Sequence, residues 1–316
     1  MCVNRNFWLV VGLVWLLPLT AAADEVQQQL NVCTADATAP GVRVAACGWL
    51  IDQKKGVPPD RQLAVYFNLA RGHDGLGEYD RATRIYAFLL EHIPPEAREH
   101  ALVRARRGDS YRLQGDWARA IADYDWLLER HPNELQVRGN RAISYAQNGQ
   151  PARAIADYDE VMRQLREAGR EIGDNVYLLR ADAYGRNGEL DKAIADCDRA
   201  LAIRASSPGY NQRAWTYYRA GRHAQAVSDV EQALALDPLN AHAAGTLAHL
   251  LVVRGQAGQA KLMFERAMLL GGTAKIKQYQ TALSGHGYKV DPTGRYDPPT
   301  NKALIACLEA GCGLVE

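Results

Sequence analysis

The chain has 316 residues, of which 47% are hydrophobic and 23% are charged. Its 37 Lys and Arg side chains nearly balance its 36 Asp and Glu side chains, so the formal net charge is +1. This balance leaves no broad basic field, and we therefore expect no nucleic-acid partner. The apolar content is sufficient for a buried core.

The N-terminal residues predict export. Arg5 precedes an apolar run over 7–17, Pro18 ends that run, and the alanines at 21–23 offer a small-residue cleavage site. This is the pattern of a cleaved secretory signal peptide over residues 1–23. No later segment approaches the roughly 20 apolar residues that a membrane helix requires. We therefore expect a periplasmic or secreted protein without a membrane span.

Five cysteines follow this leader, and an oxidising compartment would allow them to form disulfides. They are Cys33, Cys47, Cys197, Cys307 and Cys312, so one of the five stays free. Cys33 and Cys47 could join two helix-like stretches, and Cys307 and Cys312 could close a small loop beside Gly311. Cys197 occupies a core position of the repeat described below, which indicates a buried thiol. Spacing alone does not prove these pairings.

The middle of the chain repeats itself with a period of about 34 residues. Each copy has a small residue, a glycine seven positions later and an alanine five positions after the glycine. The small residues are Ala70, Gly108, Ala142, Ala181, Ala214 and Ala248; the glycines are Gly77, Gly115, Gly149, Gly188, Gly221 and Gly255; the alanines are Ala82, Ala120, Ala154, Ala193, Ala226 and Ala260. Glycine permits the left-handed residue that reverses the chain between two helices. The two small columns allow the helix axes to approach closely.

Larger residues fill the space beside these columns. They are Tyr111, Tyr145, Tyr184 and Tyr217 on the first helices and Tyr86, Tyr124, Tyr158 and Phe264 on the second. Pro94, Pro132 and Pro238 end the second helix. This pattern resembles the tetratricopeptide repeat (TPR) family.

The resemblance implies an all-α fold, a right-handed superhelix in which helix hairpins stack as an α-solenoid. Six copies are expected within 63–274, at 63–96, 101–134, 135–168, 174–206, 207–240 and 241–274. Insertions predict loops at 95–100 and 166–173. Residues 24–62 resemble a degenerate helix pair that caps the N-terminal end.

Four copies share a charged pair that is absent from the flanking copies. The arginines are Arg107, Arg141, Arg180 and Arg213, and the aspartates are Asp123, Asp157, Asp196 and Asp229. Because the two residue types occur together, we expect a structural ladder of ion pairs, either inside each hairpin or between neighbours. Arginines that bind an anionic ligand are the alternative, which is less favoured because each arginine comes with a carboxylate.

In the TPR family the first helix of each copy lines the concave face. The resemblance therefore implies a ligand-binding groove at Asp109, Arg112, Asp182, Arg186, Asn211, Trp215, Tyr218 and Arg219. Tyr and Trp flanked by Arg are typical of binding hot spots. Packing alone is the alternative for Trp215 and Tyr218. The family's lysine and asparagine set for clamping a free carboxyl terminus is missing from these positions.

The repeat pattern stops after Gly271 and Gly272. Residues 275–316 resemble a peptidoglycan-binding-like module, with a helix around Gln280, a Gly294–Tyr296 turn and a second helix that starts after Asp297. This segment departs from that family by ending without a third helix and by carrying two cysteines. A plain C-terminal cap of the array is the alternative.

No catalytic or cofactor motif stands out. His242 and His249 lack further metal ligands at suitable spacing, and there is no phosphate-binding glycine loop. His92, His100 and His131 are expected near helix ends, where a cation suits the dipole. We therefore predict a non-enzyme without a cofactor or metal, an exported scaffold that binds a protein or peptide. The alternatives are a peptidoglycan-associated protein and a secretion-linked chaperone.

Overall fold

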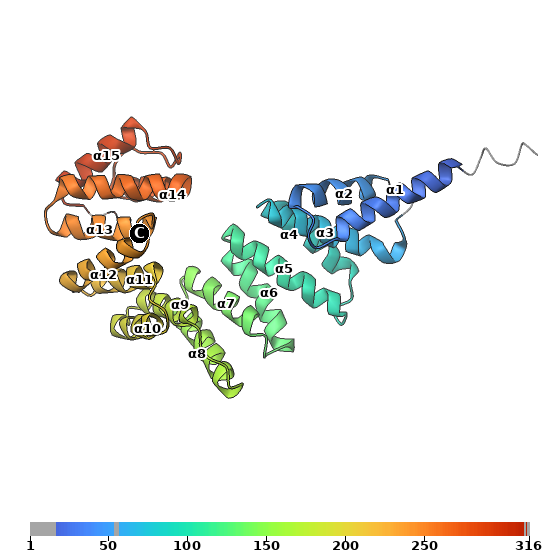
Figure 1. The fold of residues 1–316 in the computed structure, drawn as a ribbon, viewed down its shortest axis with the longest axis horizontal. Helices are drawn as coiled ribbons and strands as arrows, with labels where there is room; N and C mark the ends of the chain where they lie inside the picture. The colour runs from blue at the N-terminus through green and yellow to red at the C-terminus, as the bar shows by residue number, and fades with distance from the viewer. Residues whose placement is uncertain (1–16, 54–56, 313, 315–316) are drawn as a thin grey trace, which may run out of the picture. The chain divides into compact units, whose positions relative to one another are not determined.

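The structure is a computed structural model that describes residues 17–53, 57–312 and 314. These residues form fifteen helices and no strand, which confirms the predicted all-α class (Figure 1). The helices fall into two compact units that divide between Asn148 and Gly149. We call residues up to 148 unit 1 and residues from 149 unit 2. The division lies between the two helices of the third copy.

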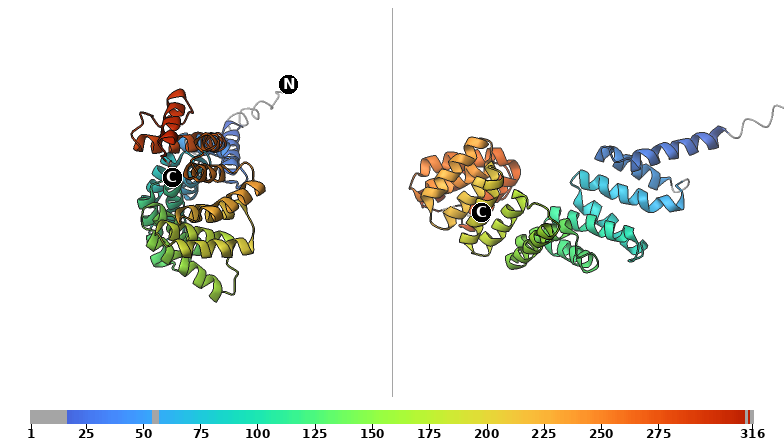
Figure 2. Two further views of the ribbon diagram at one scale, coloured as in Figure 1. Left: turned by 90° about the vertical axis from the view of Figure 1, so that its left-hand side faces the viewer. Right: turned by 60° about the horizontal axis from the view of Figure 1, so that its bottom comes forward.

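Within each unit, helices that follow one another in sequence pack as antiparallel neighbours (Figures 1 and 2). Unit 1 contains α1 (Leu17–Thr34), α2 (Pro40–Asp52), α3 (Pro59–Gly75), α4 (Tyr79–His92), α5 (Arg98–Gln114), α6 (Trp117–Arg130) and α7 (Leu135–Gln147). Unit 2 contains α8 (Pro151–Glu167), α9 (Asp174–Arg186), α10 (Leu190–Ile203), α11 (Ser207–Arg219), α12 (His223–Leu236), α13 (Ala241–Val253), α14 (Ala257–Gly285) and α15 (Pro298–Glu309). The first helices of the copies also contact each other, α5 with α7 and α11 with α9 and α13.

The turn glycines have the backbone that the repeat predicts. All six have positive φ, at Gly77 (74°), Gly115 (85°), Gly149 (72°), Gly188 (82°), Gly221 (70°) and Gly255 (71°). At Gly115 the left-handed residue ends α5, and the N–H of Asp116 then bonds back to the carbonyl of Tyr111 at 2.8 Å. This 6→1 bond is the one that closes a helix around a C-terminal glycine.

Both small columns lie at helix crossings. Every alanine in them is fully buried, and the glycine that replaces alanine in one copy, Gly108, is buried too. A Cβ atom at Gly108 would lie 2.8 Å from Cε1 of Tyr124 and 3.3 Å from Cβ of Asp123. Close approach of α5 and α6 therefore depends on the absence of a side chain at this position.

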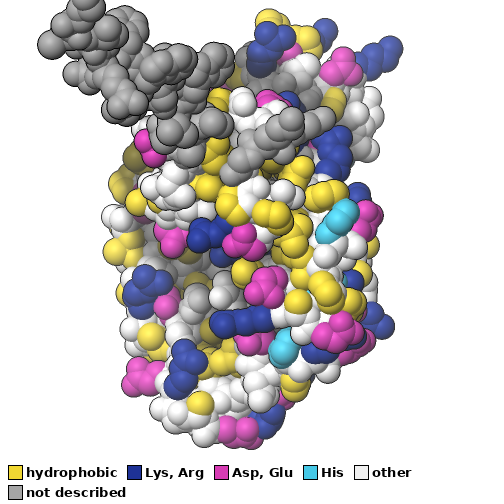
Figure 3. Space-filling model, turned by 90° about the vertical axis from the view of Figure 1, so that its right-hand side faces the viewer, with side chains coloured by type: hydrophobic (Ala, Val, Ile, Leu, Met, Phe, Trp, Pro, Cys, Tyr) yellow, Lys and Arg dark blue, Asp and Glu magenta, His cyan; other side chains and the backbone are white. Residues whose placement is uncertain are grey.

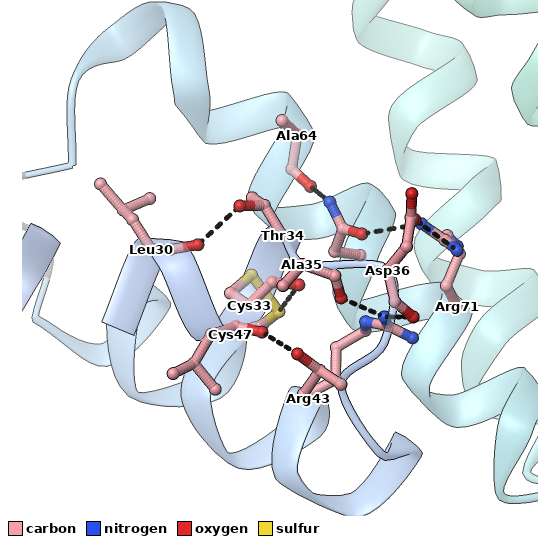
Figure 4. A network of polar contacts seen from close by, with 12 residues as sticks. Leu30, Cys33, Thr34, Ala35, Asp36, Arg43, Cys47, Ala64 and Arg71 are labelled. Atoms are coloured by element: carbon pink, nitrogen blue, oxygen red, sulfur yellow. Dashed lines mark hydrogen bonds and ion pairs between the residues drawn. A yellow bond between two sulfur atoms is a disulfide. The ribbon is translucent and has the colours of Figure 1, made fainter. Parts of the chain in front are cut away.

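A disulfide between Cys33 and Cys47 joins α1 to α2 (Figure 4). The buried side chains of Leu30, Leu50 and Val65 lie in one apolar cluster with this disulfide, so the helix pair shares a core with the first repeat helix, α3. Figure 4 also shows Arg71 of α3 bonded to Asp36, in the loop that joins α1 and α2, at 3.2 Å. These contacts fix the N-terminal helix pair on the repeat array of unit 1.

Two predicted loops are shorter than expected. Residues 98–100 belong to α5, which begins at Arg98, and residues 166–167 belong to α8, which ends at Glu167. The first copy also begins earlier than position 63, because α3 starts at Pro59. Proline is tolerated in the first turn of a helix, where its missing N–H has no intrahelical acceptor.

The C-terminal residues pack on the last hairpin. Helix α14 is interrupted at Gly272 (φ 62°, ψ −153°), and α15 then returns beside it. Leu304, Cys307 and Leu314 lie in one apolar cluster with Ala248 and Phe264. A disulfide joins Cys307 to Cys312.

The intervening loop is held by the buried amide of Gln280. Its Nε2 donates to Thr300 Oγ1 and the Arg295 carbonyl, both at 2.9 Å, and its Oε1 accepts from the Gly294 N–H at 2.8 Å. Asp297 caps α15 as predicted, because its Oδ1 accepts from the Thr300 N–H at 3.0 Å. The segment is thus built into unit 2.

The predicted leader lies mostly outside the described residues, which begin at Leu17, the first residue of α1. None of the helices in the described part of the chain has the length and apolar character needed to cross a bilayer.

Candidate binding surface

The first helices of unit 2, α9, α11 and α13, lie side by side, and we call them the inner row of unit 2. Arg219 of α11 donates from Nη1 to the Gly185 carbonyl of α9 at 2.8 Å. Asn211 of α11 accepts at Oδ1 from Thr246 Oγ1 of α13 at 2.8 Å. The inner row therefore brings six of the predicted groove residues onto two neighbouring helices, α9 and α11: Asp182, Arg186, Asn211, Trp215, Tyr218 and Arg219.

An aromatic pair forms the apolar part of this surface. The rings of Trp215 and Tyr218 stack with centroids 5.1 Å apart and an angle of 22° between planes. The buried ring of His249 meets Trp215 edge-on at 5.3 Å. Both stacked rings stay partly exposed, whereas Arg219 is exposed. The buried His249 ring thus supports the pair from the protein interior, while both stacked rings keep part of their surface accessible to solvent. Partial burial raises the pKa of the Tyr218 hydroxyl.

The remaining two groove predictions lie in unit 1, on α5. The Asp109 carboxylate accepts from the Tyr124 hydroxyl at 2.7 Å and from the Asn140 amide of α7 at 2.8 Å. Arg112 is half-buried beside the same tyrosine. Asp109 therefore links α5, α6 and α7, so much of its hydrogen-bonding capacity is used inside the protein. In unit 2 the Asp182 carboxylate accepts from Arg186 Nε at 2.8 Å and remains partly exposed.

Asp74 of α3 in unit 1 was not predicted from the sequence as a residue that links helices. The Asp74 carboxylate accepts from the Tyr86 hydroxyl at 2.8 Å and from Ser110 Oγ at 2.6 Å, which links α3, α4 and α5. Burial raises the pKa of Asp74. Asp74 stands four positions after the small residue Ala70, in the same column as Arg112, and comparison of that column between copies could have revealed it.

The predicted charged ladder takes a definite geometry. In three copies Nε and Nη2 of the arginine donate to both carboxylate oxygens of the aspartate sixteen positions later. These pairs are Arg107–Asp123 (2.8 and 2.7 Å), Arg180–Asp196 (2.7 and 2.8 Å) and Arg213–Asp229 (2.7 and 2.8 Å). Each guanidinium also lies within 6 Å of a tyrosine ring one helical turn later: Tyr111, Tyr184 and Tyr217.

The ladder also connects neighbouring copies. Arg180 and Arg213 each donate from Nη1 to an aspartate of the preceding copy, Asp159 and Asp198, both at 2.6 Å. Arg141 makes the same bond to Asp125 at 2.8 Å within unit 1. A pair between Arg141 and Asp157 stays a prediction. Both arrangements that the sequence left open, inside a hairpin and between neighbours, therefore occur together.

The Cys197 thiol and the potential metal ligands were the other candidates for chemical reactivity. Burial raises the pKa of the Cys197 thiol to about 12, which leaves it protonated and unreactive at neutral pH. Among the described residues, no group of three or more His, Cys, Asp or Glu is placed to hold a metal ion. Figure 3 shows hydrophobic, basic and acidic side chains interspersed on one face of the molecule, without a field of one sign.

Several solved structures are similar in fold. A tetratricopeptide repeat protein from Parabacteroides merdae is 17% identical, with 90% of this chain and 99% of that chain covered and a TM-score of 0.69. The type IV pilus biogenesis factor PilW is 18% identical, with 65% and 91% covered and a TM-score of 0.53. The C-terminal part of a TPR protein from Cytophaga hutchinsonii is 17% identical, with 79% and 94% covered and a TM-score of 0.50. At such low identity the likeness concerns the fold alone.

A search among curated proteins finds no match to this sequence. Three family models described as "Tetratricopeptide repeat" match residues 105–167, 174–238 and 217–283. The third match extends beyond the interruption at Gly272, into the segment that resembles a peptidoglycan-binding module. Together these matches cover more than half of the sequence, and the chain belongs to the tetratricopeptide repeat family.

Proposed function

We propose that this protein is a scaffold that binds a segment of a partner protein on the inner row of unit 2. The observation that carries the proposal is the stacked Trp215–Tyr218 pair, which is partly exposed beside the exposed Arg219. Stacked aromatic rings offer a large rigid contact area at small entropic cost, and a neighbouring arginine adds a donor for carbonyl or carboxylate groups.

The neighbouring polar groups suit an extended peptide. Asp182 and Arg186 lie on α9, the helix to which Arg219 of α11 is bonded, and Asn211 on α11 lies one turn before Trp215. Carboxylate, guanidinium and amide groups can bond to the backbone and side chains of a peptide chain. We infer that the rings take an apolar side chain and that the polar residues fix the direction of the segment.

The test is capture of a partner by the chain that starts at residue 24. We expect Trp215→Ala and Arg219→Glu to remove a specific partner from the captured fraction while circular dichroism shows that both variants stay folded. Arg199→Glu is the matched control, because Arg199 is an exposed arginine on a second helix, α10. Equal recovery by wild type and by both inner-row variants would refute binding at this surface.

We further propose that the protein works in the cell envelope after export. The leader pattern over 1–23 supports this location, as do the disulfides Cys33–Cys47 and Cys307–Cys312, because disulfides persist in oxidising compartments. Fractionation of cells should recover the chain outside the cytoplasm with one titratable thiol, that of Cys197, after denaturation. Recovery in the cytoplasm with six free thiols, that of Cys2 in the uncleaved leader included, would refute export.

Binding of peptidoglycan by residues 275–316 is the alternative function. The apolar packing of α15 on α14 favours a capping role for this segment instead. The alternative predicts that the protein sediments with purified cell wall and that removal of 275–316 abolishes sedimentation. A supernatant that retains the intact protein would exclude the alternative.

A further inference from the structure

Two arginines flank one indole ring in unit 1. Cζ of Arg104 lies 4.6 Å from the ring centroid of Trp126, and Cζ of Arg130 lies 4.0 Å from the same centroid. Arg104 comes from α5, whereas Trp126 and Arg130 are one turn apart on α6. We call these three residues the Arg–Trp–Arg cluster. Trp126 is partly exposed and Arg130 is 46% exposed, so the cluster is open to solvent.

The positive charge of the cluster exceeds what its buried neighbour can neutralise. Asp123 is nearly fully buried and accepts from both Arg107 and Arg104, so one carboxylate serves two guanidinium groups. Nε of Arg104 is buried and has no acceptor within the described part of the chain. Within the described residues, the only carboxylate paired with Arg130 is that of the exposed Glu129, at 3.6 Å.

The buried His100 lies within the excess positive charge of this cluster. His100 lies in the first turn of α5 and contacts the Trp126 ring with centroids 4.9 Å apart. Burial, followed by the charges of Arg104, Arg107 and Arg130, lowers the pKa of His100. The prediction of a dipole-stabilised cation was therefore wrong for His100, because this residue lies at the positive end of its helix and is buried. Its Nδ1 has no partner among the described residues.

The repeat fold does not require this arrangement. In the first copy the same three columns hold Tyr66, Phe88 and His92, whose neighbouring rings contact each other in tilted arrangements with centroids 4.9 and 4.2 Å apart. The fourth and fifth copies hold Tyr177, Arg199 and Ile203 and Tyr210, Gln232 and Leu236. Only the second copy places two arginines at the ends of this triplet with an aromatic ring between them. The pair of arginines around an aromatic ring is thus a local feature of unit 1, and the repeat fold forms without it in the other copies.

We propose that the Arg–Trp–Arg cluster is a docking site for an acidic segment of a partner protein, whose carboxylates bind Arg104 and Arg130 while an apolar side chain packs on Trp126. A carboxylate matches the guanidinium donors and offsets the repulsion between two like charges on one ring. The partly exposed indole between the cations favours a peptide over a free anion, because a peptide also supplies an apolar side chain that can pack on the ring. This site is separate from the inner row of unit 2.

Fluorescence anisotropy with defined peptides tests the proposal on the chain from residue 24 onward. The probe is a fluorescein-labelled Glu-Glu-Leu repeat peptide, and a Lys-Lys-Leu repeat is the charge-reversed probe. We expect binding of the acidic peptide alone, with weaker affinity at higher salt. Arg104→Gln/Arg130→Gln should weaken binding by about tenfold or more, the loss expected when two charge-assisted contacts are removed.

Two controls separate loss of the site from loss of the fold. Arg81→Gln/Arg84→Gln removes the same charge from exposed positions of α4 and should bind like wild type. Arg130→Gln alone changes an exposed side chain and should keep the thermal unfolding midpoint while weakening binding. Trp215→Ala should bind the acidic peptide normally, which distinguishes this site from the inner row.

Three results would overturn the proposal. The first is equal binding of the acidic and basic peptides, and the second is unchanged affinity in both Arg130 variants. The third is binding of inorganic phosphate to the cluster without binding of the acidic peptide, which would identify a site for a free anion.

Discussion

Arg180 and Asp196 form two parallel hydrogen bonds, Nε to Oδ2 at 2.7 Å and Nη2 to Oδ1 at 2.8 Å. The pair is largely buried, with 10% of the arginine side chain and 2% of the aspartate side chain exposed. The remaining Nη1 of Arg180 donates to Asp159 of the preceding helix pair. One guanidinium therefore ties three consecutive helices, α8, α9 and α10, and positions α9 in the inner row.

Arg180→Ala should destabilise the protein strongly. The substitution leaves the Asp196 carboxylate buried without its main counter-charge, which costs about 3–5 kcal/mol when one partner of a buried pair is lost. Urea unfolding followed by circular dichroism measures the loss. Arg199→Ala, at an exposed arginine 3.3 Å from the same aspartate, should cost less than about 1 kcal/mol. Similar losses in both variants would contradict a structural ladder.

Alanine substitution should have opposite effects at two helical glycines of unit 1. A Cβ at Gly108 would meet the Tyr124 ring, so Gly108→Ala should lose about 1–3 kcal/mol by overpacking. A Cβ at Gly139 meets nothing within 4 Å, so Gly139→Ala should gain about 0.5–1 kcal/mol from helix propensity. The urea unfolding midpoints of the two variants, each compared with wild type, measure these opposite changes. A stabilised Gly108→Ala variant would show that α5 and α6 tolerate a wider separation.

The N-terminal disulfide should contribute measurably to stability. Cys33 and Cys47 are separated by 14 positions, and closing a loop of this size contributes about 3 kcal/mol in the chain-entropy model. Cys33→Ser/Cys47→Ser should therefore unfold at lower urea concentration than wild type. Cys307→Ser/Cys312→Ser, which opens a loop of 5 positions, should lose about 2 kcal/mol in the same model. A larger loss for the C-terminal pair would contradict this ordering.

The raised pKa of Asp74 in the folded protein predicts that stability depends on pH. Because its pKa is raised in the folded state, the folded protein binds more protons than the unfolded chain just above the ordinary aspartate pKa of about 3.9. The contribution of Asp74 to the free energy of unfolding therefore falls as the pH rises through this window. Asp74→Asn should remove that fall, whereas Glu91→Gln, at an exposed position of α4, should leave it unchanged.

Urea unfolding between pH 4 and 7 measures this difference between variant and wild type. Subtracting the wild-type profile removes the contributions of carboxylates with lowered pKa values, such as Glu78 and Glu265. Parallel profiles for Asp74→Asn and wild type would show that Asp74 does not titrate differently on folding.

Much of the fold follows from the sequence because it depends on contacts inside one hairpin. The positive φ of Gly115 and the burial of Ala120 are local consequences of a turn and a helix crossing. The same holds for the bidentate pairing of Arg107 with Asp123, two residues that a single copy contains. Periodicity reveals such relations because each copy repeats the same local geometry.

Contacts between copies were harder to predict, because the period does not give the offset at which hairpins stack. The bond from Arg213 to Asp198 depends on that offset, and no feature of the repeat pattern distinguishes Asp198 from other carboxylates. Asp109 shows a related difficulty. It occupies a groove column, yet Tyr124 and Asn140 satisfy much of its carboxylate. A residue's column shows its face of the helix but not which neighbours occupy its polar atoms.

Site-specific photo-crosslinking can show directly whether a partner protein binds at the inner row of unit 2. A photoreactive phenylalanine analogue is placed at Tyr218 in the inner row of unit 2, or at the exposed Gln232 on the second helix α12. We expect a covalent adduct with one partner protein from position 218 and none from position 232. An adduct from position 232 with none from position 218 would contradict binding at the inner row.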